Sequence, residues 1–380
     1  MPIAAITRRL QAFLQLEAAG GIVLMLSAAL AIAIANTPFS EGYEHLLHHD
    51  IFQGISPHSL IADGLMAVFF FAVGMELKYE MREGELAGPG QKTLPLIAAL
   101  GGVITPALIY LAITRAHPEL RAGWAIPTAT DIAFALGVLK LIGNRVPDSA
   151  KAFLLAIAIY DDLAAIVIIA LVYSTTLAAI PLAFAALCAG VLFLLNRFNR
   201  APLWAYLLVG AAMWLAFFHG GIHPTVAGVA AGIAIPLRSR NDRTLLHDTL
   251  DTLHPYVAFG VMPLFALASA GVAFDNLTFA AALAPLPLGI AAGLVVGKQC
   301  GIFGATWFAT RFKFVEAPSD MRTLYGIALI AGIGFTMSLF IGQLALGADE
   351  QNAIRLGVIA GSVLSAVAGC ALLRRNPVMA

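Results

Sequence analysis

Long apolar stretches separated by short polar connections run through the whole chain. A membrane-spanning helix needs about 20 mostly apolar residues, and stretches of that kind recur with connections too short to hold a soluble domain. The twelve stretches are residues 11–35, 59–77, 94–114, 122–142, 151–173, 177–196, 202–218, 222–237, 255–274, 285–310, 324–346 and 354–373. The pattern predicts an all-α polytopic membrane protein with about twelve transmembrane helices and one integral membrane domain over residues 1–380.

The composition narrows the class further. The chain is 60% hydrophobic and 12% charged, whereas a soluble domain has roughly 45–50% apolar and about 25% charged residues. A soluble enzyme and a disordered protein are therefore excluded. Its 22 basic residues balance 22 acidic ones, so no positive field attracts nucleic acid. Three cysteines without a C-x-x-C pair exclude a disulfide framework and a zinc ribbon.

The lysines and arginines predict the orientation, because cytoplasmic connections are enriched in them. With a cytoplasmic N-terminus, the inner connections hold 18 of the 22 basic residues, the outer ones hold three, and Lys298 lies within a span. Both termini are then cytoplasmic. The first apolar stretch is longer than the apolar region of a signal peptide, so we expect it to remain as a span.

The longest outer connection, residues 36–58, contains His45, His48 and His49. Histidines can bind metal ions, but no carboxylate–histidine spacing on a predicted helix supports a site here. We interpret these histidines as solvated loop residues.

Four ionisable residues lie in the middle of predicted spans: Asp131, Asp161, Asp162 and Lys298. Such groups are costly in a bilayer and are functional candidates by default. The alternative is a set of ion pairs that only hold helices together, but three acids and one lysine leave carboxylates without a countercharge. Three further acids lie closer to the ends of the second span, where interfacial or structural roles are favoured: Asp63, Glu76 and Glu80.

The adjacent pair Asp161 and Asp162 predicts cation chemistry. Neighbouring residues on a helix lie about 100° apart, so both carboxylates can border one cavity. Two carboxylates this close repel each other, and burial favours the neutral acid. We expect the pair to hold protons near neutral pH and to lose them when a hard cation arrives, since carboxylate oxygens suit such ions. Lys298, if adjacent, would neutralise one aspartate in the empty state.

Two spans contain residues that interrupt helices. Pro127 precedes Asp131 in the fourth, and Gly332 and Gly334 lie together in the eleventh. Proline and glycine both weaken a helix interior, so we expect two broken helices that meet at mid-membrane. Asp131 would compensate the positive helix ends there. The alternative is a pair of ordinary kinked helices.

The broken spans each lie in the middle of a trio of spans, within residues 94–173 and 285–373. The trios are seven spans apart, so the second enters the membrane from the opposite side. This layout is typical of an inverted repeat, which permits alternating access.

Several strings resemble the NhaA-type bacterial sodium/proton antiporters over residues 10–375. The strings are A-T-D ending at Asp131, Y-D-D ending at Asp162, G-K-x-x-G around Lys298, G-I-G-F-T-M-S from Gly332, F-F-F-A-V-G-M-E-L-K around Glu76 and G-I-H-P-T-V-A-G around His223. The inverted repeat is itself a known property of this family, so it belongs to the resemblance and is not independent support.

The resemblance implies a twelve-helix carrier of the bacterial inner membrane that exchanges Na⁺ or Li⁺ for H⁺ without a cofactor. Asp162 would be the principal ion ligand and Asp161 the second, with Lys298 paired to Asp161. Thr130 and Asp131 would lie where the broken helices cross. If both aspartates lose a proton for each sodium ion, exchange moves net charge. The family also forms homodimers, partly through a β-hairpin that would fall within residues 43–58 here.

The family's pH regulation is associated with charged residues at the cytoplasmic entry to the ninth span. The candidates here are Glu76, Glu80, His247, Asp251 and His254, because histidine titrates near neutral pH. The entry to the ninth span, R-T-L-L-H-D-T-L-D-T-L-H-P, is more acidic than the family pattern. The resemblance therefore does not define the pH range of activity. Interfacial roles for the two histidines are equally compatible with the sequence.

Other functions remain to be distinguished. A sodium-coupled solute symporter shares the ion chemistry but needs an organic-substrate pocket, for which no polar or aromatic cluster is evident. An intramembrane aspartyl protease needs an acid after a Gly-x-Gly string, and here Phe335 follows Gly334. A passive channel fits poorly with broken spans and titrating carboxylates.

Overall fold

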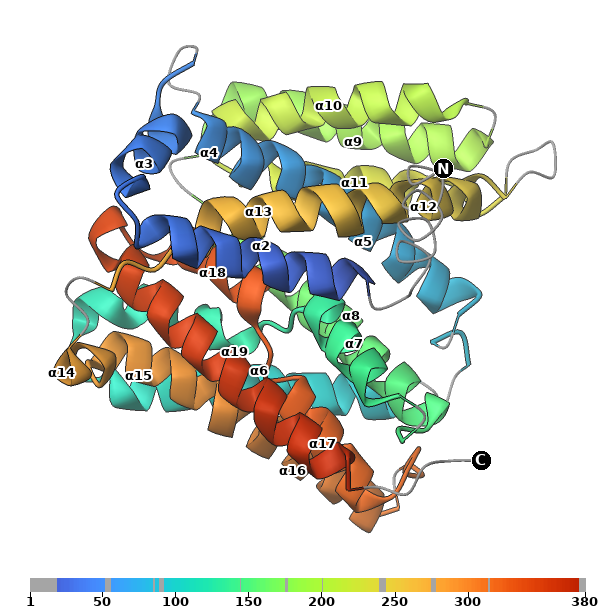
Figure 1. Cartoon of the computed structure of the whole chain (residues 1–380). Helices are drawn as coiled ribbons and strands as arrows, with labels where there is room; N and C mark the ends of the chain where they lie inside the picture. The colour runs from blue at the N-terminus through green and yellow to red at the C-terminus, as the bar shows by residue number, and fades with distance from the viewer. Residues whose placement is uncertain are drawn as a thin grey trace, which may run out of the picture. The chain divides into compact units, whose positions relative to one another are not determined.

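The computed structural model describes residues 19–51, 56–84, 86–88, 92–143, 145–174, 177–199, 201–238, 244–274, 278–313 and 315–375. These residues are helical and form no β-strand (Figure 1). The all-α prediction is confirmed.

The α-helices follow one another through short connections. They are α2 (Ala19–Ala35), α3 (Ser40–His48), α4 (Pro57–Ser59), α5 (Met66–Arg82), α6 (Thr93–Ile113), α7 (Ile132–Ile142), α8 (Asp148–Val172), α9 (Ala179–Phe198), α10 (Leu203–Gly220), α11 (Thr225–Ala234), α12 (Leu245–Tyr256), α13 (Met262–Ser269), α14 (Phe279–Ala282), α15 (Pro285–Ala292), α16 (Lys298–Arg311), α17 (Met321–Ile330), α18 (Phe335–Ala345) and α19 (Gln351–Leu373). Three π-helical stretches, η1 (Leu60–Leu65), η3 (Val257–Val261) and η4 (Gly293–Gly297), and two 3₁₀ helices, η2 (Pro118–Thr128) and η5 (Ala348–Glu350), join them.

Eight helical segments of the described chain are long and apolar enough to cross a membrane, and three bent helix pairs raise the number to eleven. Each of the twelve predicted stretches contains helix. The stretch 222–237 forms only the ten-residue helix α11, which spans about 15 Å, half of a hydrocarbon core of about 30 Å. Within the described residues, the prediction of about twelve helices is met by up to eleven candidate spans and this shorter apolar helix.

Two expectations differ from the structure. The helix expected to begin at residue 255 begins at Leu245. Its first part, α12, was missed because its many polar residues do not form an apolar stretch. The expected β-hairpin is wrong for residues 43–48, which belong to helix α3, while residues 52–55 lie outside the described chain. In α3, Leu47 is buried and the apolar residues Tyr43, Leu46 and Leu47 have helical spacing, which favours a helix over a strand.

Both predicted broken helices are confirmed. The axes of η2 and α7 bend by 45°, and those of α17 and α18 by 46°. Glycine is needed at the second break for space, since a Cβ on Gly332 would lie 2.6 Å from the Leu294 carbonyl oxygen.

The chain divides into two compact units. Unit 1 comprises the described residues of Met1–Thr37, Thr93–Asp161 and Ser269–Ala380. It contains both broken helices, and within it α6 packs on α16, and α19 on α15 and α17. The α6 and α16 backbones approach closely at Gly101 and Gly301, where a Cβ on Gly101 would lie 2.3 Å from the Gly301 carbonyl oxygen.

Unit 2 comprises the described residues of Pro38–Lys92 and Asp162–Ala268. Within it α5 packs on α11, and α9 lies beside α10 (Figure 1). Its core is apolar and includes Phe71, Met75, Tyr206 and Phe217.

Candidate ion-binding site

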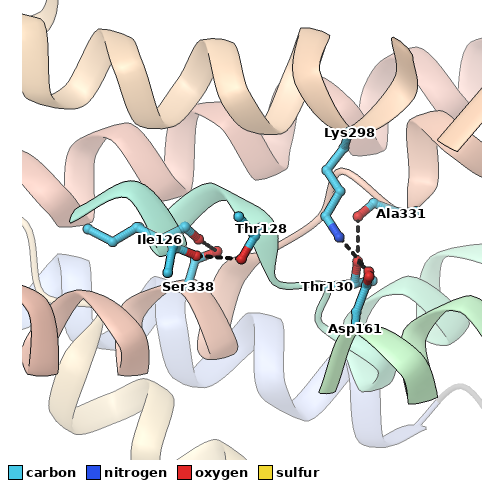
Figure 2. A network of polar contacts seen from close by, with 8 residues as sticks. Ile126, Thr128, Thr130, Asp161, Lys298, Ala331 and Ser338 are labelled. Atoms are coloured by element: carbon cyan, nitrogen blue, oxygen red, sulfur yellow. Dashed lines mark hydrogen bonds and ion pairs between the residues drawn. The ribbon is translucent and has the colours of Figure 1, made fainter. Parts of the chain in front are cut away.

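The two helix breaks of unit 1 lie against each other. The chain becomes extended at Ala129 and Asp131 after η2 ends. The Asp131 backbone N–H donates to the Ile333 carbonyl oxygen at 2.7 Å. The Thr130 hydroxyl lies 2.9 Å from the Ala331 carbonyl oxygen (Figure 2). Polar groups at the first break, where the helical hydrogen bonds are interrupted, are therefore bound by carbonyl oxygens of the second break.

Asp131 stabilises the starts of two half-helices. Its Oδ1 accepts a hydrogen bond from the Phe134 N–H at 2.9 Å, at the first turn of α7. Its Oδ2 accepts from the Thr336 N–H at 3.0 Å, at the first turn of α18, and from the Thr336 hydroxyl. A carboxylate at a helix N-terminus satisfies unpaired N–H groups and opposes the positive end of the helix dipole. The buried carboxylate of Asp131 thus caps the half-helix that follows each break.

Asp161 forms a buried ion pair with Lys298, and both side chains are fully buried. The Thr130 hydroxyl lies 2.7 Å from the same Asp161 oxygen, Oδ2. Figure 2 draws this contact beside the ion pair. Because a hydroxyl carries one proton, it donates either to this oxygen or to the Ala331 carbonyl. Asp161 Oδ1 is buried and accepts no hydrogen bond from the described residues.

Asp162 follows Asp161 on α8 and is also fully buried. The structure thus brings Thr130, Asp131, Asp161 and Lys298 to the breaks of unit 1, and Asp162 follows Asp161 in the sequence.

Some contributors were not identified from the sequence. Ser362 on α19 accepts a hydrogen bond from the Phe335 N–H at 3.1 Å, at the start of α18. Ser338 donates to the Ile126 carbonyl oxygen at 2.7 Å. The π-helical stretch η4 directly precedes Lys298, and such stretches are frequent at functional sites. Of these, only Ser338 carried a recognisable signal, because it ends the G-I-G-F-T-M-S string.

The candidates for pH regulation lie in unit 2, on α5 and α12. His247 Nε2 lies 3.4 Å from Asp251 Oδ2, and its ring centroid lies 5.7 Å from that of Tyr79. Glu80 is buried, and His254 is exposed. Glu76 precedes Glu80 by one helical turn of α5.

Unit 2 also contains a contact between a histidine and an aspartate that was not predicted from the sequence. His223 Nε2 lies 3.4 Å from Asp63 Oδ1, and His223 Nδ1 lies 2.8 Å from the Thr225 hydroxyl. The Trp214 indole donates to the Asp63 carbonyl oxygen at 3.2 Å. Asp63 is therefore part of a polar contact within unit 2 and not an isolated interfacial acid.

The histidines near α3 and α4 stack in pairs, with ring centroids 5.4 Å apart for His45 and His49 and 5.1 Å apart for His48 and His58. Within the described residues, no group of three or more potential metal ligands occurs.

The chain is similar to known proteins over almost its whole length. The family model described as Na+/H+ antiporter 1 matches residues 11–373. The Na(+)/H(+) antiporter NhaA of Paramagnetospirillum magneticum is 49% identical over 367 residues, covering 96% of this chain and 95% of the relative. NhaA of Vibrio parahaemolyticus is 46% identical, with 95% and 96% covered. NhaA 2 of Pseudomonas syringae pv. tomato is 49% identical, with 98% and 95% covered. The chain therefore belongs to the Na+/H+ antiporter 1 family.

Proposed function

We propose that Asp161 and Asp162 hold the transported Na⁺ or Li⁺ ion and exchange it for protons. Family membership makes the chain a sodium/proton antiporter, which is a transporter and not an enzyme and needs no cofactor besides the transported ions. The observation that carries the proposed site is the buried Lys298–Asp161 ion pair, with the Thr130 hydroxyl on the same carboxylate oxygen.

The oxygens at the break suit a hard cation, which prefers carboxylate, carbonyl and hydroxyl ligands. Asp161 Oδ1 has a free acceptor position among the described residues. In the cation-free state the Lys298 ammonium balances Asp161. A sodium ion that arrives at the carboxylates replaces this countercharge and displaces protons. Asp131 remains bound to the starts of α7 and α18.

The exchange is electrogenic if two protons leave the site for each sodium ion that binds. Because Asp161 is already ionised in its pair with Lys298, these protons come from Asp162 and from the released Lys298 ammonium. The membrane potential then drives cytoplasmic sodium outward against external protons. Alternating access by an inverted repeat over residues 94–173 and 285–373 provides the movement. Its support is that both helix breaks lie in unit 1 and touch each other.

The proposed location is the bacterial inner membrane, with both termini in the cytoplasm, as the distribution of basic residues indicates. The protein is surrounded by the lipid bilayer and forms a homodimer in which the first outer loop takes part. In pH regulation, Glu76, Glu80, His247, Asp251 and His254 alter the charge of α5 and α12. The contact between His247 and Asp251, next to Tyr79 of α5, supports this role.

The test uses inside-out membrane vesicles with an acid-loaded lumen and a pH-sensitive dye. Added sodium or lithium is expected to collapse the gradient, and potassium is not. Asp162→Asn should abolish the response, whereas the matched change at the exposed Asp349, Asp349→Asn, should retain it. Exchange that survives Asp161→Asn and Asp162→Asn together would show that the proposed site is wrong. A symporter would respond to sodium only after an organic solute is added.

A further inference from the structure

A pocket with basic residues in a mainly apolar wall lies in unit 1 at the carboxyl end of α16. Its volume is about 840 Å³, within the range of about 300–1,000 Å³ that is typical of ligand sites. The wall includes Trp307, Arg311, Lys313, Glu316 and Ala317. None of these residues belongs to the ion-binding site.

The charge of the wall favours an anion. Arg311 and Lys313 oppose a single acid, Glu316. All three side chains are exposed, and within the described part of the chain neither basic side chain is held by an ion pair or a hydrogen bond. Both basic groups are therefore available to a ligand. They must also overcome the negative end of the α16 dipole, which by itself repels anions.

The backbone at Lys313 is unusual. Its φ is 56°, the left-handed region that glycine and asparagine occupy far more readily than lysine. The turn is closed by a hydrogen bond from the Lys313 N–H to the Thr310 carbonyl oxygen at 3.1 Å. A disfavoured conformation that brings a lysine to a pocket is a reason to look for a function there.

The surroundings of the pocket indicate a lipid as the source of the anion. Trp307, Phe308 and Phe312 are 48%, 53% and 58% exposed at this end of α16, and the rings of Phe308 and Phe312 lie 4.6 Å apart. Aromatic side chains at the ends of spans are typical of the membrane–water interface, and basic pockets between spans at this level bind anionic headgroups.

We propose that this pocket binds the phosphate headgroup of an anionic phospholipid, with its acyl chains along the exposed aromatic side chains of α16. Arg311 and Lys313 contact the phosphate oxygens, and Trp307 lies at the level of the ester groups. With the topology proposed above, the lipid belongs to the cytoplasmic leaflet. The headgroup fixes the carboxyl end of the helix whose first residue is Lys298.

The test measures quenching of Trp307 by brominated phosphatidylglycerol in phosphatidylcholine nanodiscs that hold the full chain. The signal from Trp307 is the difference between the protein and Trp307→Phe. Half-maximal quenching should need about five-fold more phosphatidylglycerol for Arg311→Gln or Lys313→Gln, and about 25-fold more for both, at about 1 kcal/mol for each basic residue. Glu316→Gln should need less lipid than the unchanged protein.

The matched control is Arg374→Gln with Arg375→Gln, which removes the same charge at the end of α19 and should leave the quenching curve unchanged. An equal loss in the two double variants would overturn the proposal, because it would indicate a general charge effect. Equal quenching by brominated phosphatidylcholine would also overturn it. So would full competition by inorganic phosphate at millimolar concentration, which would indicate a soluble anion. None of these readouts depends on sodium exchange, so the proposed function can fail or hold separately.

Discussion

In both units a helix begins or ends within an apolar stretch, and a charged side chain binds that helix end. The charge is negative in unit 1 and positive in unit 2. In unit 1 the N-termini of α7 and α18 are bound by the carboxylate of Asp131. In unit 2 the C-terminus of α11 is bound by Lys78, whose Nζ donates to the carbonyl oxygens of Ile233 at 2.9 Å and Ile235 at 2.5 Å. Each charge opposes the adjacent end of the helix dipole.

The difference lies in what else is charged nearby. Beside the breaks of unit 1, Lys298 and Asp161 neutralise each other, and in the proposed function a cation replaces Lys298 as the partner of Asp161. The acceptors of Lys78 in unit 2 are neutral carbonyls, which do not titrate. In the proposed function, the cap of unit 1 therefore lies beside an exchangeable charge pair, whereas the cap of unit 2 binds neutral carbonyl oxygens.

The largest effect is expected from breaking the charge pair of unit 1. Lys298→Met leaves Asp161 without its countercharge, and removing one partner of a buried pair costs about 3–5 kcal/mol. Thermal melting of the detergent-solubilised protein measures the loss. The double variant Lys298→Met with Asp161→Asn should recover most of the stability, because no unpaired charge remains. Additive losses would mean that the two residues do not act as a pair.

The next effect tests the neutral packing of unit 2. A Cβ on Gly228 of α11 would lie 2.1 Å from the Ala67 carbonyl oxygen of α5. Gly228→Ala must move the two backbones apart, and such overpacking costs about 1–3 kcal/mol.

Gly190→Ala in α9 is the matched control for Gly228→Ala, because nothing lies within 4 Å of its added Cβ. It should be neutral or stabilising, by up to about 1 kcal/mol. Equal melting temperatures for the two variants would show that α5 and α11 do not depend on this close approach.

A third prediction removes the anchor of unit 2. Lys78→Met leaves two carbonyl oxygens at the end of α11 without their donor, and we expect a loss of about 1–2 kcal/mol because Lys78 is only partly buried. Lys92→Met is the control, since Lys92 is also partly buried but its Nζ has only a long contact, at 3.5 Å, with the Met81 carbonyl oxygen. Lys78→Arg should retain part of the stability. A larger loss for Lys78→Met than for Lys298→Met would reverse the comparison between the units.

The sequence predicted the parts of this comparison that depend on local chemistry. Pro127 and the pair Gly332 and Gly334 interrupt helices by themselves, so both breaks could be placed. The buried aspartates and Lys298 stood out because charges are rare in apolar stretches. Residue type alone was sufficient for these elements.

The rest depends on contacts between distant segments. Ser362 of α19, which binds the start of α18, is not marked by its neighbours in the sequence. The same holds for the carbonyl oxygens of Ala331 and Ile333. The end of α11 has a local signal, since Pro236 follows Ile235, but the donor to its last carbonyl oxygens is Lys78, about 155 residues earlier in the chain. The hairpin expected at residues 43–58 came from resemblance and not from the local residues, which favour helix α3.

The smallest effect concerns the same capping chemistry in a solvated place. Asp320 precedes α17, and its carboxylate accepts hydrogen bonds from the Thr323 hydroxyl at 2.6 Å and the Thr323 N–H at 3.0 Å. The hydroxyl in particular holds the pKa of Asp320 below its ordinary value. A lowered pKa means that the folded state favours the carboxylate, so this stabilisation is present above the unfolded value of about 3.9 and is lost as the pH falls through the folded value.

Asp320→Ala should cost about 1 kcal/mol at neutral pH, and its melting temperature should approach that of the unchanged protein below about pH 4. Asp320→Asn keeps an acceptor without the charge and should depend less on pH. A difference between Asp320→Ala and the unchanged protein that stays constant from neutral to acid pH would show that the charge of Asp320 does not contribute, and that only its shape stabilises the start of α17.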